Sequence, residues 1–93
     1  MASYGVASFY TEGTRTASGQ KCDPREMAAA HPAWPFGTRV RVTNVATGRS
    51  VIVKVNDRGP FVSGRVVDVS YAAAELLGIV RRGTAKVKLD IAQ

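Results

Sequence analysis

The sequence has few residues of the kinds that cross-link a small protein or bind metals. In 93 residues it contains one cysteine, Cys22, and one histidine, His31. A single cysteine excludes an internal disulfide, so side-chain packing has to stabilise the fold. One cysteine and one histidine also give no multi-ligand spacing, and we expect neither a metal site nor a bound cofactor.

Long apolar segments are missing as well. No apolar run approaches the roughly 20 residues that span a bilayer, and no basic-then-apolar leader is present. We therefore expect a soluble chain without a membrane span. The length suits one small core, so we interpret residues 1–93 as a single, monomeric domain in which residues 1–3 are an added start.

Acidic residues are outnumbered by basic ones. Seven Asp and Glu stand against 13 Lys and Arg, which gives a net charge of +6. Such an excess suits nucleic acid, an anionic lipid surface or an acidic wall polymer. Several basic residues alternate with valines, however, and this is typical of the solvated face of half-buried strands. Because glycine-rich phosphate loops and basic-aromatic motifs are missing, we expect no nucleic-acid partner.

Short β-branched segments separated by glycines predict a mainly β protein. The expected strands are Tyr4–Tyr10, Thr38–Asn44, Ser50–Val55, Arg65–Val69 and Thr84–Ile91. Many short strands with little helix favour a closed or nearly closed barrel, in which no strand edge is exposed.

One or two short helices are expected beside these strands. A first helix, over Pro24–Ala30, ends before His31, because a residue that precedes proline avoids the helical region. The second begins after Ser70 as its N-cap and ends at Gly78. The residues of this helix that we expect to face the barrel are Ala73, Leu76 and Leu77.

The segment 56–61, with the sequence Asn-Asp-Arg-Gly-Pro-Phe, is the clearest indication of chemistry. An apolar strand ends there in a carboxylate, a guanidinium and a Gly-Pro turn, so Asp57 is presented at the barrel edge as a candidate general acid. This role requires the Arg58 guanidinium to point toward substrate or a backbone carbonyl, because a neighbouring cation favours the charged form of a carboxyl group. The alternative is that Asp57 only caps the turn and pairs with Arg58.

Four other residues are candidates for the same site. His31 starts a loop and is equally suited to lining a cleft and to a structural role. Trp34 is the candidate aromatic platform for a sugar. Asp68 ends the next strand as a candidate second carboxylate, although we favour support of the following helix. A nucleophile and base pair of Cys22 with His31 is a remote alternative.

Several motifs occur in a recognisable order: Ala7-Ser8-Phe9-Tyr10, Thr16-Ala17-Ser18-Gly19, Ala28-Ala29-Ala30-His31, Pro35-Phe36-Gly37-Thr38, Val42-Thr43-Asn44, Asn56-Asp57-Arg58-Gly59-Pro60-Phe61, Gly64-Arg65-Val66-Val67-Asp68-Val69-Ser70 and Leu77-Gly78. Together, over about residues 4–91, they resemble the rare lipoprotein A family of septal-ring lytic transglycosylases. The resemblance implies a six-stranded double-psi β-barrel that acts on peptidoglycan glycan strands. It also implies the periplasm or cell envelope, reached by a lipoprotein signal on the full-length protein.

The implied reaction cleaves the bond between MurNAc and GlcNAc without water and gives 1,6-anhydromuramoyl products. The family's catalytic aspartate falls on Asp57 and its pocket histidine on His31. We expect Asp57 to protonate the leaving oxygen and then to accept the proton of the muramoyl 6-hydroxyl, while His31 orients Asp57 or the sugar. The residues expected to bind substrate are Gln20, Trp34, Asn56, Arg58 and Asp68.

Gln20 departs from the resemblance, which places a glutamate at this position. Glutamine can hydrogen-bond a sugar but cannot transfer a proton or carry charge. Either Asp57 suffices, or the activity is weakened, or the domain binds peptidoglycan without cleaving it, as an expansin-like barrel. A third hypothesis, a nucleic-acid-binding barrel, rests on net charge alone and predicts steep salt dependence.

Overall fold

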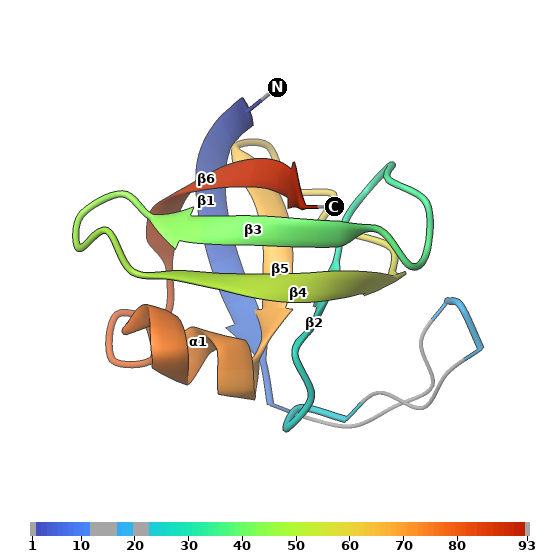
Figure 1. Cartoon of the computed structure of the whole chain (residues 1–93), viewed down its shortest axis with the longest axis horizontal. Coiled ribbons are helices and arrows are strands. Elements are labelled where there is room, and N and C mark those ends of the chain that lie inside the picture. The colour runs from blue at the N-terminus through green and yellow to red at the C-terminus, as the bar shows by residue number, and fades with distance from the viewer. Residues whose placement is uncertain (1, 12–16, 20–22, 93) are drawn as a thin grey trace.

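The computed structural model describes residues 2–11, 17–19 and 23–92 of the chain. Its elements, in order, are β1 (Ala2–Tyr10), β2 (Ala28–Ala30), β3 (Arg39–Asn44), β4 (Ser50–Asp57), β5 (Arg65–Ser70), α1 (Tyr71–Leu77) and β6 (Ala85–Ala92) (Figure 1). The strands form a closed barrel in the order β1-β5-β2-β4-β3-β6. The predicted barrel is therefore confirmed, and all five predicted strand segments are present.

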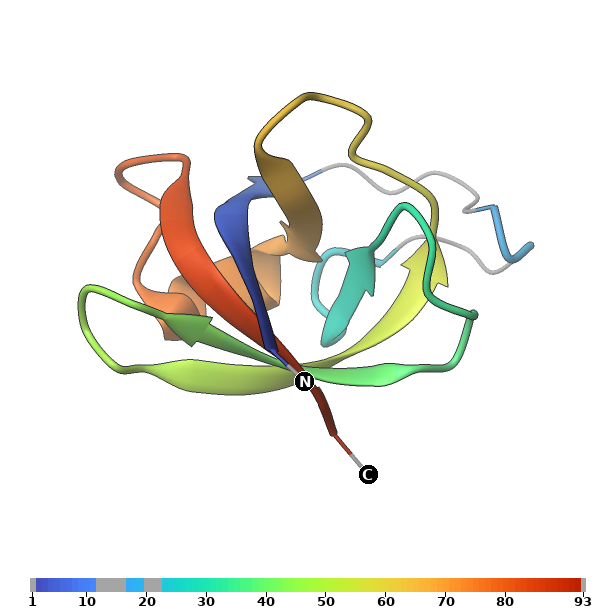
Figure 2. The same ribbon diagram turned by 90° about the horizontal axis from the view of Figure 1, so that it is seen from above.

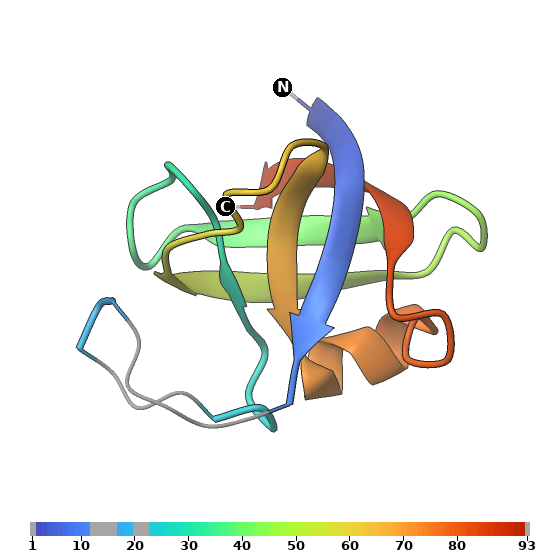
Figure 3. The same cartoon turned by 180° about the vertical axis from the view of Figure 1, so that it is seen from behind.

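The barrel mixes parallel and antiparallel pairs. β1 pairs with β5, and β2 with β4, in parallel, whereas the other four pairs are antiparallel. Figure 3 shows β1 and β5 side by side and pointing the same way. Parallel strands cannot be joined by a tight hairpin, so long connections have to cross the ends of the barrel. The segment between β4 and β5 joins two strands that are not neighbours, because β2 lies between them in the barrel.

The barrel interior is filled mainly by β-branched side chains that alternate with outward residues. Each of four strands contributes two side chains that are at most 1% exposed: Val40 and Val42, Val53 and Val55, Val67 and Val69, and Val87 and Leu89. Branched side chains pack well on a pleated surface, which explains why these segments form strands. The outward residues of the same strands include the basic ones noted in the sequence.

The predicted helix over Pro24–Ala30 is wrong. The segment instead makes a turn and then the short strand β2, whose three alanines are all buried. Alanine has the highest intrinsic helix propensity, but such propensities are small and tertiary pairing overrides them. Here β2 is hydrogen-bonded to β4 on one side and to β5 on the other.

The predicted second helix is confirmed at both ends. The Ser70 side chain accepts a hydrogen bond from the Ala73 N–H, and Gly78 ends the helix in the left-handed conformation with φ of 74°. The helix contacts β4, β1 and β5 and lies below the barrel in Figure 1. Its buried residues are Ala73, Ala74 and Leu77, whereas Leu76 is 58% exposed, so the prediction for Leu76 is wrong.

Within the described part of the chain, no helix is both long and apolar enough to cross a bilayer.

Gly5 lies where β1 packs closely against β5. A Cβ atom at Gly5 would lie 2.3 Å from Cγ1 of Val66, closer than side-chain atoms approach. We expect Gly5→Ala to lower the free energy of unfolding by about 1–3 kcal/mol, as overpacking does, measured by urea denaturation. In the Val66→Ala background, Gly5→Ala should lower the free energy of unfolding by a smaller amount. An equal decrease in both backgrounds would contradict the packing explanation.

Candidate active site at the end of β4

The short strand β2 brings two carboxylates into one row. Ala30 is the register partner of Asp57 on β4 and of Asp68 on β5, and Asp68 is in turn the partner of Ser8 on β1. Partners in neighbouring strands project to the same face of a sheet. The Cα atoms of Asp57 and Asp68 are therefore two strand spacings, or about 10 Å, apart.

A register shift in β4 is needed for this row. Ala29 pairs with Val55 but Ala30 pairs with Asp57, so Asn56 is an extra residue in β4. An extra residue of this kind locally re-aims the side chains that follow it. Without the shift, Asn56 rather than Asp57 would stand opposite Ala30.

The Asp57 carboxylate is fixed through one of its oxygens. Oδ1 accepts hydrogen bonds from the backbone N–H groups of Ala17 and Arg58, each at 2.8 Å. The Asp57 carbonyl oxygen accepts from the His31 N–H at 3.1 Å. No described residue donates to Oδ2. The carboxylate is therefore oriented by backbone N–H groups through Oδ1.

Arg58 is directed away from Asp57. Its Nη1 donates to the carbonyl oxygens of Trp34, at 2.8 Å, and His31, at 3.3 Å. The guanidinium carbon lies 4.1 Å from the centre of the Phe36 ring, a cation–π contact. The condition set by the sequence, that Arg58 points to a backbone carbonyl, is met, and the described residues contain no ion pair of Arg58 with Asp57. Arg58 holds the loop between β2 and β3 against the end of β4.

His31 is held in one neutral tautomer. Its Nδ1 accepts hydrogen bonds from the N–H groups of Ala33, at 3.1 Å, and Trp34, at 3.0 Å. An atom that accepts two hydrogen bonds carries no proton, so the ring proton is on Nε2. Burial, and secondarily the positive charge of Arg58, lower the pKa of His31 from its usual value of 6.5. At neutral pH, His31 is therefore an uncharged donor.

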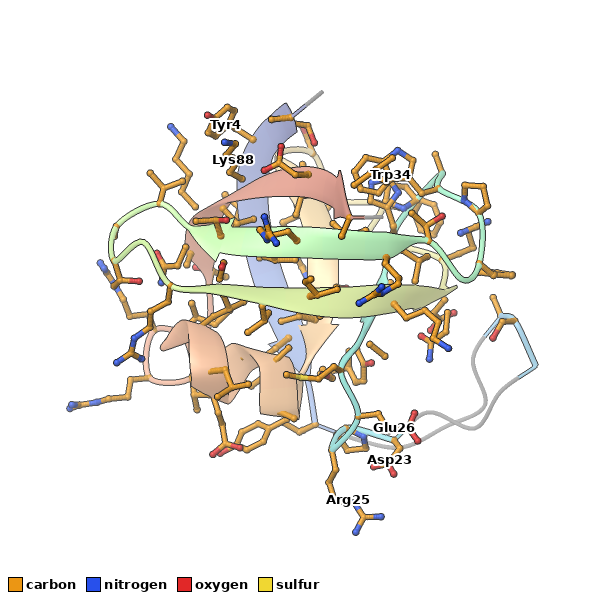
Figure 4. All side chains as sticks on the ribbon, in the orientation of Figure 1. Tyr4, Asp23, Arg25, Glu26, Trp34 and Lys88 are labelled. Carbon is orange, nitrogen blue, oxygen red and sulfur yellow. The ribbon has the colours of Figure 1, made fainter. Side chains whose placement is uncertain are left out.

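Trp34 is only partly available as a platform. Its ring stacks on the His31 ring with centroids 4.0 Å apart and planes 5° apart, so one face is covered. The residue lies on the far side of the barrel from α1 (Figure 4). Phe36 and Phe61, by contrast, are 42% and 80% exposed and flank the turn that follows Asp57. Neither ring was predicted as a site residue, although each adjoins a glycine or proline in the sequence.

Asp68 does not support the helix, so the favoured interpretation of this residue is wrong. Its carboxylate accepts hydrogen bonds from Arg65 Nη2, at 2.6 Å, and from the Ser8 hydroxyl. The first turn of α1 contains no acidic residue, and Ser70 alone caps it. Ser8 and Arg65 were not predicted. Residues 65 and 68 would face opposite sides of a regular strand, and a register shift between Val6 and Ala7 in the β1–β5 pair accompanies their contact.

Asn56 lies against a cavity of about 280 Å³ beside the Asp57 turn. Its side chain is only 6% exposed, and Oδ1 has no hydrogen-bond partner in the described part of the protein. Gln20 and Cys22 lie outside the described residues. The structure thus brings Asp57, His31, Trp34, Asn56 and Arg58 together, with Asp68 two strands away.

Comparison with known proteins gives a family match over most of the chain. A family model described as lytic transglycolase matches residues 2–89. The endolytic peptidoglycan transglycosylase RlpA of Pseudomonas aeruginosa is 52% identical over 89 residues, or 92% of this chain and 26% of that protein. A probable endolytic peptidoglycan transglycosylase RlpA of Nostoc sp. is 51% identical over 92 residues, or 94% and 25%. The chain spans about a quarter of the length of these relatives.

Two solved structures share the fold. The Streptomyces papain inhibitor superimposes with a TM-score of 0.83 at 24% identity, covering 100% of this chain and 96% of that one. The apo expansin of Clavibacter michiganensis gives 0.78 at 23% identity, with 100% and 51% covered. At these identities the likeness shows the fold alone. Together with the family match it confirms the predicted double-psi β-barrel.

The protonation of His31 is directly measurable because the chain has one histidine. We expect its NMR titration midpoint to lie below 6.5, and Arg58→Gln to raise it, because that substitution removes the neighbouring positive charge. A lowered folded-state pKa means that the unfolded chain binds more protons just below pH 6.5. The free energy of unfolding should therefore fall as the pH drops through that window, and less so in His31→Gln. A midpoint at or above 6.5 would refute the locked neutral ring.

Proposed function

This chain belongs to the lytic transglycolase family, and on that premise we propose that it cleaves the glycosidic bond between the muramoyl and glucosaminyl sugars of peptidoglycan. The bond is broken without water, and the products end in 1,6-anhydromuramoyl groups. The family relatives named for this activity are about half identical to the chain over its length. The assignment rests on the Asp57 carboxylate. Backbone N–H groups orient it, and the Arg58 side chain binds a carbonyl oxygen instead of pairing with it.

Asp57 alone supplies the proton transfers in this proposal. As the general acid, it donates a proton to the oxygen that leaves the muramoyl anomeric carbon. The muramoyl 6-hydroxyl then attacks that carbon, its oxygen closes the anhydro ring, and its proton returns to Asp57. A hydrolase that activates water uses two carboxylates, whereas an internal hydroxyl as nucleophile needs only one acid and base. The single carboxylate at the end of β4 is suited to this task.

The surrounding residues position the sugars. The Nε2–H of His31 is a neutral donor suited to a sugar oxygen, and the same residue fixes the Asp57 backbone through its own N–H. Arg58 maintains the cleft wall by holding the carbonyls of His31 and Trp34. Because Asp68 already accepts from Arg65 and Ser8, we assign it to sugar hydroxyls and not to proton transfer.

A non-catalytic peptidoglycan-binding barrel is the second candidate. It is favoured by Gln20, a residue without acid or base chemistry where the resemblance places a glutamate. The fold is also shared with an expansin. Both candidates place the protein in the cell envelope, and we propose the periplasm, where peptidoglycan strands are accessible.

Asp57→Asn separates cleavage from binding. Asparagine keeps the shape and an Oδ1 that accepts from Ala17 and Arg58, but it has no transferable carboxyl proton. We expect anhydromuramoyl-ended products to fall by at least about 10²-fold, measured by mass spectrometry of material released from purified peptidoglycan. Binding to sacculi in a pulldown should persist.

The matched control is Asp90→Asn, which alters a partly exposed carboxylate that pairs with Lys88 on β6. It should release products at the wild-type rate. Unchanged product release by Asp57→Asn would remove Asp57 from the mechanism. Reducing-end products from the wild type would indicate hydrolysis, and sacculus binding without any product would favour the binding barrel.

A further inference from the structure

A hollow of about 630 Å³ lies at the end of the barrel opposite Asp57. It is framed by the β3–β4 turn and by the connection from α1 to β6, which Figures 1 and 3 both show at the same end of the barrel. β4 starts at this end and runs for eight residues to Asp57, so about 20 Å separate the hollow from the proposed active site. None of the residues assigned to that site lines the hollow.

The buried Asn44 side chain holds the walls of this hollow together. Its Nδ2 donates to the carbonyl oxygen of Leu77, at the end of α1, at 2.9 Å, and its Oδ1 accepts from the Ala46 N–H at 3.0 Å. The Val45 N–H donates to the carbonyl oxygen of Lys86 on β6 at 3.1 Å. These bonds join the turn to both neighbouring elements. The hollow is therefore formed in advance of any ligand, as binding sites usually are.

The segments that frame the hollow carry positive charge alone. Residues 27–56 and 76–89 contain no Asp or Glu. Arg82 and Lys86 line the hollow, and both are exposed. Neither forms an ion pair with a described residue. Positive charge that is gathered in a concave surface attracts anions.

Arg49 adds a third positive charge at the edge of the hollow. A Cβ atom at Gly78, which lines the hollow, would lie 2.9 Å from Arg49 Nη1. The guanidinium thus lies at the C-terminal end of α1, where a cation is favourable for the helix itself. This structural explanation accounts for Arg49. It does not extend to Arg82 and Lys86, which follow the helix in the chain.

Hydroxyl groups complete the set of donors. Thr47 and Thr84 line the hollow and are exposed. Thr47 Oγ1 accepts a hydrogen bond from the Arg49 N–H at 3.2 Å, which leaves its own O–H free to donate. A carboxylate has only two oxygens for such donors, whereas a phosphate group has more around one centre and matches the guanidinium fork. Cations together with hydroxyls therefore favour phosphate.

The hollow is much larger than one phosphate group. Its volume lies within the roughly 300–1,000 Å³ of small-molecule sites, and its lining includes Val45, which is 48% exposed. A ligand that fills it carries an organic part beside its charge.

We propose that this hollow binds the phosphate group of an organic phosphate ester. Arg82 and Lys86 bind the charged oxygens, Thr47 and Thr84 donate to them, and the organic part of the ester packs on Val45. A soluble phosphate ester and the headgroup of an anionic phospholipid share this chemistry. The inference is independent of the proposed function, because its residues lie at the other end of the barrel from Asp57.

The test uses both sources of phosphate at an ionic strength of about 0.15 M, where long-range attraction is screened. Glycerol 3-phosphate is titrated into the ¹⁵N-labelled protein, with glycerol and acetate as controls. Sedimentation with phosphatidylglycerol vesicles is compared with sedimentation with phosphatidylcholine vesicles. We expect at least one phosphate source to bind, with saturable shifts of the Thr84 and Lys86 amide signals if it is the soluble ester. Glycerol, acetate and phosphatidylcholine should not bind.

Charge-neutralising variants locate the binding. Arg82→Gln and Lys86→Gln should each weaken it about two- to fivefold, and the double variant about tenfold. The matched control is Lys54→Gln, which removes the same charge from an exposed strand lysine that lines a different cavity, and it should change nothing. Thr84→Glu places a carboxylate in the hollow and should abolish binding.

The probes also identify the source of the phosphate. Binding of glycerol 3-phosphate identifies a soluble ester, and binding of phosphatidylglycerol vesicles alone identifies a lipid headgroup. The proposal is overturned if neither source binds or if acetate gives the same response. Equal weakening by Lys54→Gln would indicate attraction by net charge, and unchanged binding by Thr84→Glu would place the ligand elsewhere. Either result also overturns the proposal.

Discussion

The pairing of β2 with two neighbours at once is the constraint on which the site depends. Three buried alanines join β4 to β5 and so help to close the barrel. Ala30 stands between Asp57 and Asp68 in the row that crosses these strands. A larger outward side chain at Ala30 would project between the two carboxylates, where alanine adds only a methyl group.

The Arg58 side chain points away from the neighbouring Asp57 carboxylate. Here two carbonyl oxygens and the Phe36 ring occupy the guanidinium. The same contacts hold the β2–β3 loop, which contains His31, against the end of β4. Arg58 therefore forms a wall beside Asp57 and makes no ion pair with it.

Local patterns in the sequence were enough to predict the strands, the Ser70 cap and the Gly78 stop, because each depends on neighbouring residues. They failed for β2. Alanine has a high helix propensity, and only the pairing of β2 with β4 and β5 makes this segment a strand. The Ser8–Asp68 contact joins residues 60 positions apart and depends on register, which no local pattern specifies. For Asp57 and His31, a family resemblance indicated the residues, but the backbone contacts that orient them appear only in the fold.

The closed strand order also places the two ends of the sheet together. Ala2 on β1 is the register partner of Asp90 on β6 (Figure 2). A short linker across this pair, with new termini opened in the exposed turn between β3 and β4, would keep every strand pairing of the barrel. The fold is thus a suitable host for circular permutation, because the order of its strands in space does not depend on where the polypeptide is cut.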